Sequence, residues 1–191
     1  MRRRESLRAM VYFIALSSVI GAIVHLGIVL LTPLYATRDA YARLAPLGDA
    51  LATVALGQAS PSERLLPYAD PAVAMAFCRY DLSLGPLRVH VPTDRAGLIS
   101  LSFHSMRGNV FYALTDKAAQ HGGLDALIAT PEQMRKIMAA DSEDNPSQDL
   151  RVAAPAAQGF VFVRAFSELP GLYAAALAQA KELTCEAQAA P

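Results

Sequence analysis

The sequence contains no tryptophan, only two cysteines among 191 residues, and only 18% charged residues. Two cysteines cannot build a disulfide-dense scaffold, and 53% hydrophobic residues are too many for a disordered, charged chain. The motifs His-Glu-x-x-His, Cys-x-x-Cys and Gly-x-Ser-x-Gly and the phosphate-binding loop are also missing. The sequence therefore predicts a folded protein, indicates no metal or cofactor, and leaves open whether the protein is an enzyme.

The formal net charge of zero hides an uneven distribution along the chain. Residues 1–9 carry four arginines against one glutamate, whereas residues 10–31 carry no charged side chain. From Thr32 onward, 13 of the 17 basic and 16 of the 17 acidic residues remain, which gives this part a net charge of −3. An acidic domain does not attract a phosphate backbone, so we expect no nucleic-acid partner.

The uncharged run of residues 10–31 predicts a membrane-spanning helix. As an α-helix it would be ~33 Å long at ~1.5 Å per residue, enough to cross a hydrocarbon core of ~30 Å. Because the arginines precede the run, the positive-inside rule places residues 1–9 in the cytoplasm and exports the remainder. We expect a single-pass protein of a bacterial inner membrane that contacts lipid through residues 10–31 and has a periplasmic C-terminal domain.

A cleaved signal peptide is the main alternative to a retained anchor. Its apolar stretch normally has about 7–15 residues and ends at small residues. Here the stretch is longer, and the nearest exit, residues 34–36, places the large side chain of Tyr35 where a small one is needed. We therefore favour an uncleaved signal-anchor. A transporter component would need several such helices, for instance through association at the small residues Ser17 and Gly21.

Export would place Cys78 and Cys185 in an oxidising compartment. A disulfide between them would close a loop of about 107 residues, worth ~4–5 kcal/mol in the chain-entropy model. The alternative is a pair of separate buried thiols that pack as small hydrophobic residues. We favour the disulfide, which would join a C-terminal helix to the first strand of the exported domain.

Hydrophobic periodicity divides the exported part in two. Residues 32–66 carry apolar side chains near helical spacing and predict a helical connector, whereas the period of about two that begins within residues 67–191 predicts a β-rich domain with a C-terminal helix. The order of elements lacks the alternation of a doubly wound fold. We predict an α+β fold: one transmembrane helix, then a mostly antiparallel sheet or sandwich-like domain with packed helices. The predicted strands are 72–81, 87–91, 97–104, 110–114, 124–129, 150–154 and 160–166, and the predicted helices of the domain are 130–140 and 170–183.

Polar side chains collect on one side of two predicted strands. Arg88 and His90 alternate with apolar residues in one strand, and Ser102 and His104 do so in the next. If these strands are neighbours, the two histidines could share a metal, or one could act as general base to Ser102. Because the pattern contains no third ligand and no orienting carboxylate, a solvated sheet face is the favoured interpretation, and we assign no metal site and no catalytic residue.

Arg164 lies inside an apolar strand, where an unpaired charge would be costly. Asp81 is a plausible partner for this charge, and a ligand-binding arginine is the sharper alternative. The candidate ligand-binding set is therefore His90, His104, Arg164, Arg88 and Ser102.

Five stretches of the exported part, residues 70–82, 85–89, 98–116, 127–133 and 159–164, share their pattern with a known family. Over roughly residues 35–183 the chain resembles the domain of unknown function 1254 family. The resemblance implies a β-rich, sandwich-like fold, and the short members with one N-terminal membrane helix imply a membrane location. Larger relatives carry a second domain of unknown function, numbered 1214, so the resemblance also implies a separate partner protein that carries this companion domain. It implies no activity and no catalytic residue.

These observations favour a membrane-anchored envelope protein whose β-rich domain is a binding or assembly module for a partner protein. The alternative is an envelope hydrolase or carbohydrate-active domain that uses the polar sheet face. A concave pocket lined by His90 and His104 would support the alternative, whereas a flat or covered face would argue against it.

Overall fold

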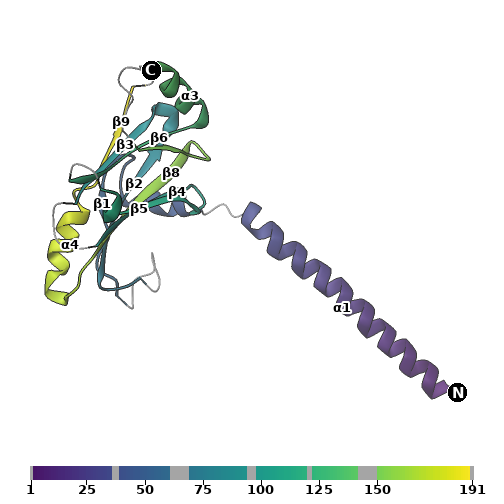
Figure 1. Cartoon of the computed structure of the whole chain (residues 1–191). Helices are drawn as coiled ribbons and strands as arrows, with labels where there is room; N and C mark the ends of the chain where they lie inside the picture. The colour runs from purple at the N-terminus through teal and green to yellow at the C-terminus, as the bar shows by residue number, and fades with distance from the viewer. Residues whose placement is uncertain are drawn as a thin grey trace. The chain divides into compact units, whose positions relative to one another are not determined.

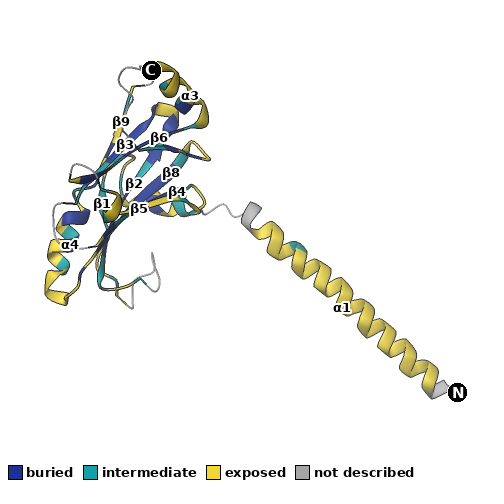
Figure 2. Cartoon of the chain, in the orientation of Figure 1, coloured by how far each residue is buried: buried dark blue, intermediate teal, exposed yellow. Residues whose placement is uncertain are grey.

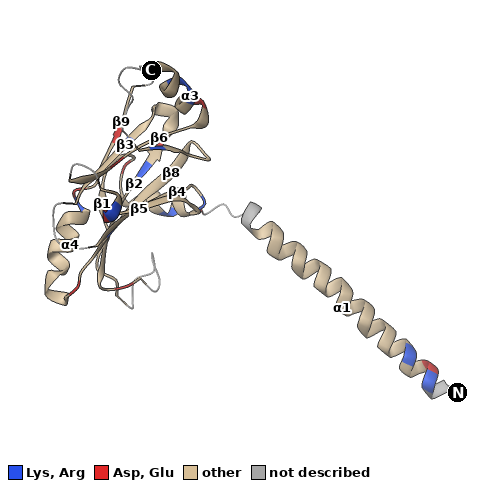
Figure 3. Cartoon of the chain, viewed as in Figure 1, with Lys and Arg blue, Asp and Glu red and all other residues tan. Residues whose placement is uncertain are grey.

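The N-terminal part of the chain is one uninterrupted helix, α1 (Arg2–Tyr35) (Figure 1). The structure is a computed structural model that describes residues 2–35, 39–60, 69–93, 98–119, 122–141 and 150–189. It separates into two compact units, residues 1–37 and 38–191. The charged side chains of α1 lie near its N-terminal end only (Figure 3), so the rest of the helix is uncharged and mostly apolar.

The composition and exposure of α1 suit a membrane. Its segment Arg4–Thr32 is long and apolar enough to cross a bilayer, and its side chains are exposed rather than packed in a core (Figure 2). The hydroxyls of Ser18 and Thr32 donate to carbonyl oxygens one turn earlier, at 2.8 and 2.6 Å. These bonds satisfy polar groups that lipid cannot satisfy. The predicted apolar helix is thus present, with the length of an anchor or a signal sequence.

Two β-sheets form the framework of the second unit. The five-stranded sheet has the order β1–β2–β8–β4–β5 and the four-stranded sheet the order β7–β6–β3–β9. Neighbouring strands are antiparallel except β6 and β7, which are parallel. The strands of the larger sheet are β1 (Val54–Ala55), β2 (Val73–Asp81), β8 (Gln158–Phe166), β4 (Ile99–Ser105) and β5 (Val110–Thr115). Those of the smaller sheet are β7 (Arg151–Ala153), β6 (Gly123–Ala129), β3 (Leu87–Pro92) and β9 (Thr184–Ala187).

Short helices connect and flank the strands of this unit. The longest, α3, begins with a capping box: Thr130 Oγ1 accepts from the Gln133 N–H, and Gln133 Oε1 accepts from the Thr130 N–H. This start agrees with the prediction of a helix at residue 130. The helices are α2 (Ala40–Leu44), α3 (Pro131–Ala140) and α4 (Tyr173–Ala180), with short 3-10 turns η1 (Ala45–Leu47), η2 (Leu82–Leu84), η3 (Asp116–Ala118) and η4 (Pro170–Leu172).

The inner faces of the two sheets share one buried core. Because alternate residues of a strand point to the same face, every second residue of β2, β3 and β8 enters this core. Their burial, at about 25 cal/mol per Å² of apolar surface, is the main source of the unit's stability. The predicted α+β fold is confirmed. The core residues of these three strands include Ala74, Ala76, Cys78, Leu87, Val89, Val91, Val161, Val163 and Ala165.

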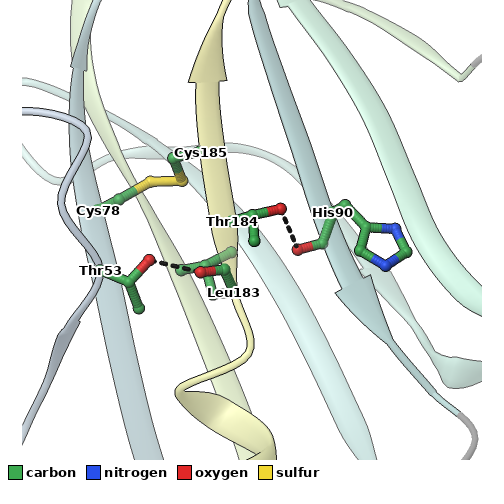
Figure 4. The surroundings of a disulfide bond; sticks show 6 residues. All are labelled: Thr53, Cys78, His90, Leu183, Thr184 and Cys185. Carbon is green, nitrogen blue, oxygen red and sulfur yellow. Dashed lines mark hydrogen bonds between the residues drawn. A yellow bond between two sulfur atoms is a disulfide. The ribbon is translucent and has the colours of Figure 1, made fainter.

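A disulfide between Cys78 and Cys185 joins the two sheets across this core, as predicted (Figure 4). Cys78 lies on β2 and Cys185 on β9, and their Cα atoms are 6.6 Å apart. Close by, the hydroxyl of Thr53 donates to the carbonyl oxygen of Leu183. The C-terminal segment is therefore attached to the larger sheet by a covalent bond and by a hydrogen bond beside it.

The predicted C-terminal helix over 170–183 is too long, because α4 ends at Ala180. After Leu183, the chain extends into β9, which pairs with β3. Cys185 therefore lies on a strand, so the disulfide holds β9, rather than a helix, to β2. The four residues of β9 are too few to show an alternating pattern, and their pairing depends on a strand distant in sequence.

The predicted helical connector over 32–66 is also mostly wrong among the residues that the structure describes there. Beyond the end of α1 at Tyr35, only α2 and the turn η1 are helical there, and the chain then adds β1 to the edge of β2. Pro46 begins the departure from helix, and Leu51 adopts a positive φ of 67°, which no helix contains. Residues 61–66 lie outside the described part.

Removal of the disulfide should destabilise the second unit without changing its fold. We expect the double variant Cys78→Ala/Cys185→Ala to lose about 4–5 kcal/mol of unfolding free energy, because the unfolded chain regains the entropy of a long open loop. Denaturant unfolding of the full chain in detergent, followed by circular dichroism, measures this loss. Reductant should destabilise the wild type and leave the double variant unchanged, so a wild type insensitive to reduction would contradict the prediction.

Candidate functional site

The outer face of the five-stranded sheet carries both an apolar cluster and a short chain of polar side chains. The cluster, called here the outer cluster, receives side chains from β2, β8, α2 and the segment that follows β1. Its buried members are Leu44, Leu56, Met75, Phe77, Phe160 and Phe162. The polar side chains, Ser102, His104 and Arg164, come from the neighbouring strands β4 and β8.

Strand register brings these three polar side chains together. Ser102 lies opposite Phe162, His104 lies opposite Phe160, and Arg164 lies opposite Ser100. Arg164 Nη1 donates to Ser102 Oγ at 2.7 Å, and Ser102 Oγ lies 3.0 Å from His104 Nε2. The sequence alternation had placed Ser102 and His104 on one face, but only the β4–β8 pairing adds Arg164 to them.

The direction of each hydrogen bond follows from the turn between β4 and β5. His104 Nδ1 lies 3.0 Å from the carbonyl oxygen of Gly108, so Nδ1 must carry the proton and donate. Nε2 of the neutral ring then accepts, and the Ser102 hydroxyl donates to it. Gly108 has a φ of 93°, a conformation that favours glycine and lets this turn direct its carbonyl at the ring. The polar chain therefore runs from Arg164 through Ser102 and His104 to Gly108.

Aromatic rings of the outer cluster surround the imidazole and the guanidinium. The His104 ring stacks on Phe160 with centroids 4.8 Å apart and meets the edge of Phe162 at 5.6 Å. Arg164 Cζ lies 5.4 Å from the centroid of Phe162, within cation–π range. Phe160 and Phe162 were predicted only as buried strand residues, and the apolar spacing gave no signal of their contact with polar groups.

Burial sets the charge state of these groups. It lowers the pKa of His104, the bond to Gly108 opposes this shift, and the positive charge of Arg164 lowers the pKa further. Burial also lowers the pKa of Arg164, although a guanidinium stays protonated at neutral pH. A neutral histidine beside a charged arginine is therefore the state that this environment favours.

The backbone of His104 is held from the inner face of the sheet. The hydroxyl of Tyr80, a fully buried residue, donates to the His104 carbonyl oxygen at 3.4 Å. Gly159 on β8 makes room for this contact, because a Cβ at that position would collide with both the Tyr80 hydroxyl and the His104 carbonyl. Burial raises the pKa of Tyr80, so it stays a neutral donor.

The approach of His90 to His104, which depended on their strands being neighbours, does not occur. His90 lies on β3 in the four-stranded sheet, whereas His104 lies on β4 in the five-stranded sheet. His90 Nδ1 is instead 2.9 Å from a carboxylate oxygen of Asp125 on the adjacent strand β6. Arg88 shares the strand and the face of His90, so it too is separate from the polar chain. β3 and β4 follow one another in the sequence, but the chain crosses from the four-stranded to the five-stranded sheet between them.

Asp81 is not the partner of Arg164. Asp81 lies at the opposite end of β2 from the position that faces Arg164, and it accepts from Gln158 Nε2 at 2.8 Å. Hydrogen bonds from Ser83 and Gln158 hold the pKa of Asp81 below its usual value. Within the described ranges, no carboxylate lies within 4.0 Å of the Arg164 guanidinium nitrogens.

The hydrogen bond between Ser102 and His104 resembles that of a catalytic serine with its general base, but the surroundings of the two side chains do not suit catalysis. Ser102 is only 5% exposed and His104 only 7% exposed, so a substrate carbonyl cannot reach the hydroxyl oxygen. His104 donates to a backbone carbonyl rather than to a carboxylate. The part of the chain that the structure describes also contains no group of three residues able to hold a metal. The arrangement orients Arg164 rather than activating Ser102.

Residues 53–187 match the family described as "Protein of unknown function (DUF1254)". The chain belongs to this family. The predicted resemblance is thereby confirmed over the whole of the two-sheet domain. No curated protein matches the chain in sequence.

Two solved structures are similar to this DUF1254 chain at low sequence identity, and the first of them shares its fold. The VPA0106 protein of Vibrio parahaemolyticus aligns with a TM-score of 0.54 and 13% identity, over 78% of this chain and 34% of its own. An uncharacterised protein from Burkholderia cenocepacia aligns with a TM-score of 0.45 and 13% identity, over 80% and 41%. The DUF1254 chain thus spans about a third of the length of the first.

The lowered pKa of His104 predicts that acid destabilises the fold. In the unfolded chain a histidine has a pKa of ~6.5, and the pKa of His104 in the folded domain is lower. As the pH falls below ~6.5, the unfolded state therefore binds a proton that the folded state does not. The free energy of unfolding should fall over this range and level off once the folded His104 is also protonated. We expect His104→Gln to lose less stability than the wild type between pH 7.5 and 5. Denaturant unfolding at the two pH values measures this difference.

His90→Gln is the control for the loss of a histidine as such, because it removes one from the other sheet. Equal acid losses in the wild type and in His104→Gln would show that His104 is not held neutral by its surroundings.

Proposed function

We propose that this DUF1254 protein is a membrane-tethered module of the bacterial envelope whose periplasmic domain binds a partner protein. In this proposal α1 is retained as a single-pass anchor in the inner membrane, with residues 1–9 in the cytoplasm. The partner is a protein that carries the companion domain of larger relatives, which fits the short span of this chain along the VPA0106 protein.

The features of α1 and the disulfide support this location. The exposed apolar side chains of α1 are typical of a helix that contacts lipid or of a signal sequence. The arginines of α1 lie at the end that the positive-inside rule assigns to the cytoplasm. The disulfide between Cys78 and Cys185 needs an oxidising compartment, which the periplasm supplies. Both features agree with export of the two-sheet domain.

The observation that carries partner binding is the exposed edge of β5. Among the described residues only β4 pairs with β5, so the other side of β5 presents backbone N–H and C=O groups without a neighbouring strand. Val110 is 56% exposed and Tyr112 is 38% exposed on this strand. Proteins usually protect such edges with lysine, proline or bulges. β5 contains no lysine or proline, and its register is irregular only near its start.

A strand contributed by a partner would pair with this edge and cover its apolar side chains. Strand addition of this kind derives affinity from main-chain hydrogen bonds and specificity from alternate side chains. Burial of Ser102 and His104 supports this module over the hydrolase alternative, since neither side chain is open to a substrate.

Charge on the β5 edge should abolish partner binding. We expect Val110→Lys/Tyr112→Lys to lose the partner on co-purification from solubilised membranes, because lysines on a strand edge oppose pairing with a second strand. The matched control is Met138→Lys on α3, which places a lysine at an exposed apolar position away from the edge. Met138→Lys should retain the partner. Recovery of the wild type without any partner, or retention by the β5 variant, would contradict the proposal.

A further inference from the structure

Arg164 carries a charge that no other side chain of the described structure neutralises. Among the described residues, Arg164 donates one hydrogen bond, to Ser102, and contacts the ring of Phe162. The residue is partly exposed, and its Nε and Nη2 form no hydrogen bond to the described residues. A half-buried guanidinium with free, accessible donors is a site at which an anion gains both a charge partner and hydrogen bonds.

Arg79 on the same sheet face shows what a purely structural arginine looks like here. Its Nη2 donates to the carbonyl oxygen of Gly48 at 2.7 Å, and its Cζ lies 5.0 Å from the ring centroid of Tyr41. Both arginines pack against an aromatic ring, but Arg79 donates from Nη2 to the protein backbone, and its Nε is buried away from solvent. Arg164 keeps its remaining donors free of any acceptor in the described part of the chain.

The polar chain fixes the direction of these donors. The Ser102 hydroxyl donates a hydrogen bond to His104 Nε2, and its oxygen accepts one from Arg164 Nη1. The His104 ring is oriented in turn by its hydrogen bond to the carbonyl oxygen of Gly108. Phe162 covers one face of the guanidinium plane. Because Arg164 is already immobilised, binding an anion costs little additional side-chain entropy.

The charge balance selects the class of anion. The site offers one positive charge, since His104 is neutral, and the sequence from Thr32 onward has a net charge of −3. A singly charged, planar carboxylate matches one guanidinium with two parallel hydrogen bonds. A phosphate dianion would leave its second charge uncompensated in an acidic domain.

We propose that Arg164, oriented by Ser102 and His104 on the outer face of the five-stranded sheet, binds a carboxylate group. The carboxylate belongs either to a small free acid or to an acidic side chain of the partner protein. Only the second source depends on the proposed partner-binding function.

Acetate is the probe for the site itself. Titration of the full chain in detergent with sodium acetate, against sodium chloride at equal ionic strength, can be followed through the NMR signals of arginine Nε–H groups. We expect saturable shifts of the Arg164 signal with acetate that sodium chloride does not produce. Ser102→Ala should weaken acetate binding roughly tenfold, because it frees the guanidinium to rotate.

Three variants make the titration specific. Arg164→Met should abolish the saturable, acetate-dependent shifts of the remaining signals around the site. Arg79→Met and the exposed-surface variant Arg135→Met should retain them, and Arg135→Met serves alone if Arg79→Met fails to fold. Shifts that are identical in acetate and chloride, or that survive in Arg164→Met, would overturn the inference.

Co-purification distinguishes the two sources of the carboxylate. Loss of both acetate binding and the partner in Arg164→Met would assign the site to an acidic side chain of the partner. Loss of acetate binding alone would assign it to a free acid and leave the β5 interface as the partner surface. A wild type that binds its partner but not acetate would overturn the carboxylate site while leaving the proposed function intact.

Discussion

The packing of two β-sheets around one core, held together by the Cys78–Cys185 disulfide, is the constraint on which the rest of the domain depends. Because the inner faces use the small and branched residues of β2, β3 and β8, the outer faces are free to differ. The four-stranded sheet places the exposed pair of His90 and Asp125 on its outer side. The five-stranded sheet instead buries a second apolar cluster there and places Arg164 beside it.

This second cluster changes the chemistry of ordinary residues. On a solvated sheet face, His104 would titrate, and both Ser102 and His104 would exchange hydrogen bonds with water. Between Phe160 and Phe162, the imidazole loses water and stays neutral, so its Nε2 accepts a hydrogen bond from the Ser102 hydroxyl. Phe162 also excludes water from one side of Arg164. These contacts immobilise the Arg164 guanidinium, which suits the binding of an anion better than the cleavage of a bond.

Much of the fold could be predicted from the sequence, because alternation and capping are local. The strand with Ile99, Leu101 and Phe103 on one face and the helix that starts at Thr130 needed only their own residues. The site could be predicted only in part. Ser102 and His104 share a strand, but the contact with Arg164 needs the β4–β8 register. The assignment of His90 to the other sheet depends on where the chain crosses over, which no local pattern contains.

The state of the two cysteines in cells tests directly whether the two-sheet domain is exported and disulfide-linked. Cells that express the full chain are fractionated, and the thiols are alkylated with a large maleimide before and after reduction. We expect a full-length chain in the membrane fraction that reacts only after reduction, and then at two cysteines. A chain with two reactive thiols before reduction, or one found only in the cytosol, would contradict an exported, disulfide-linked domain.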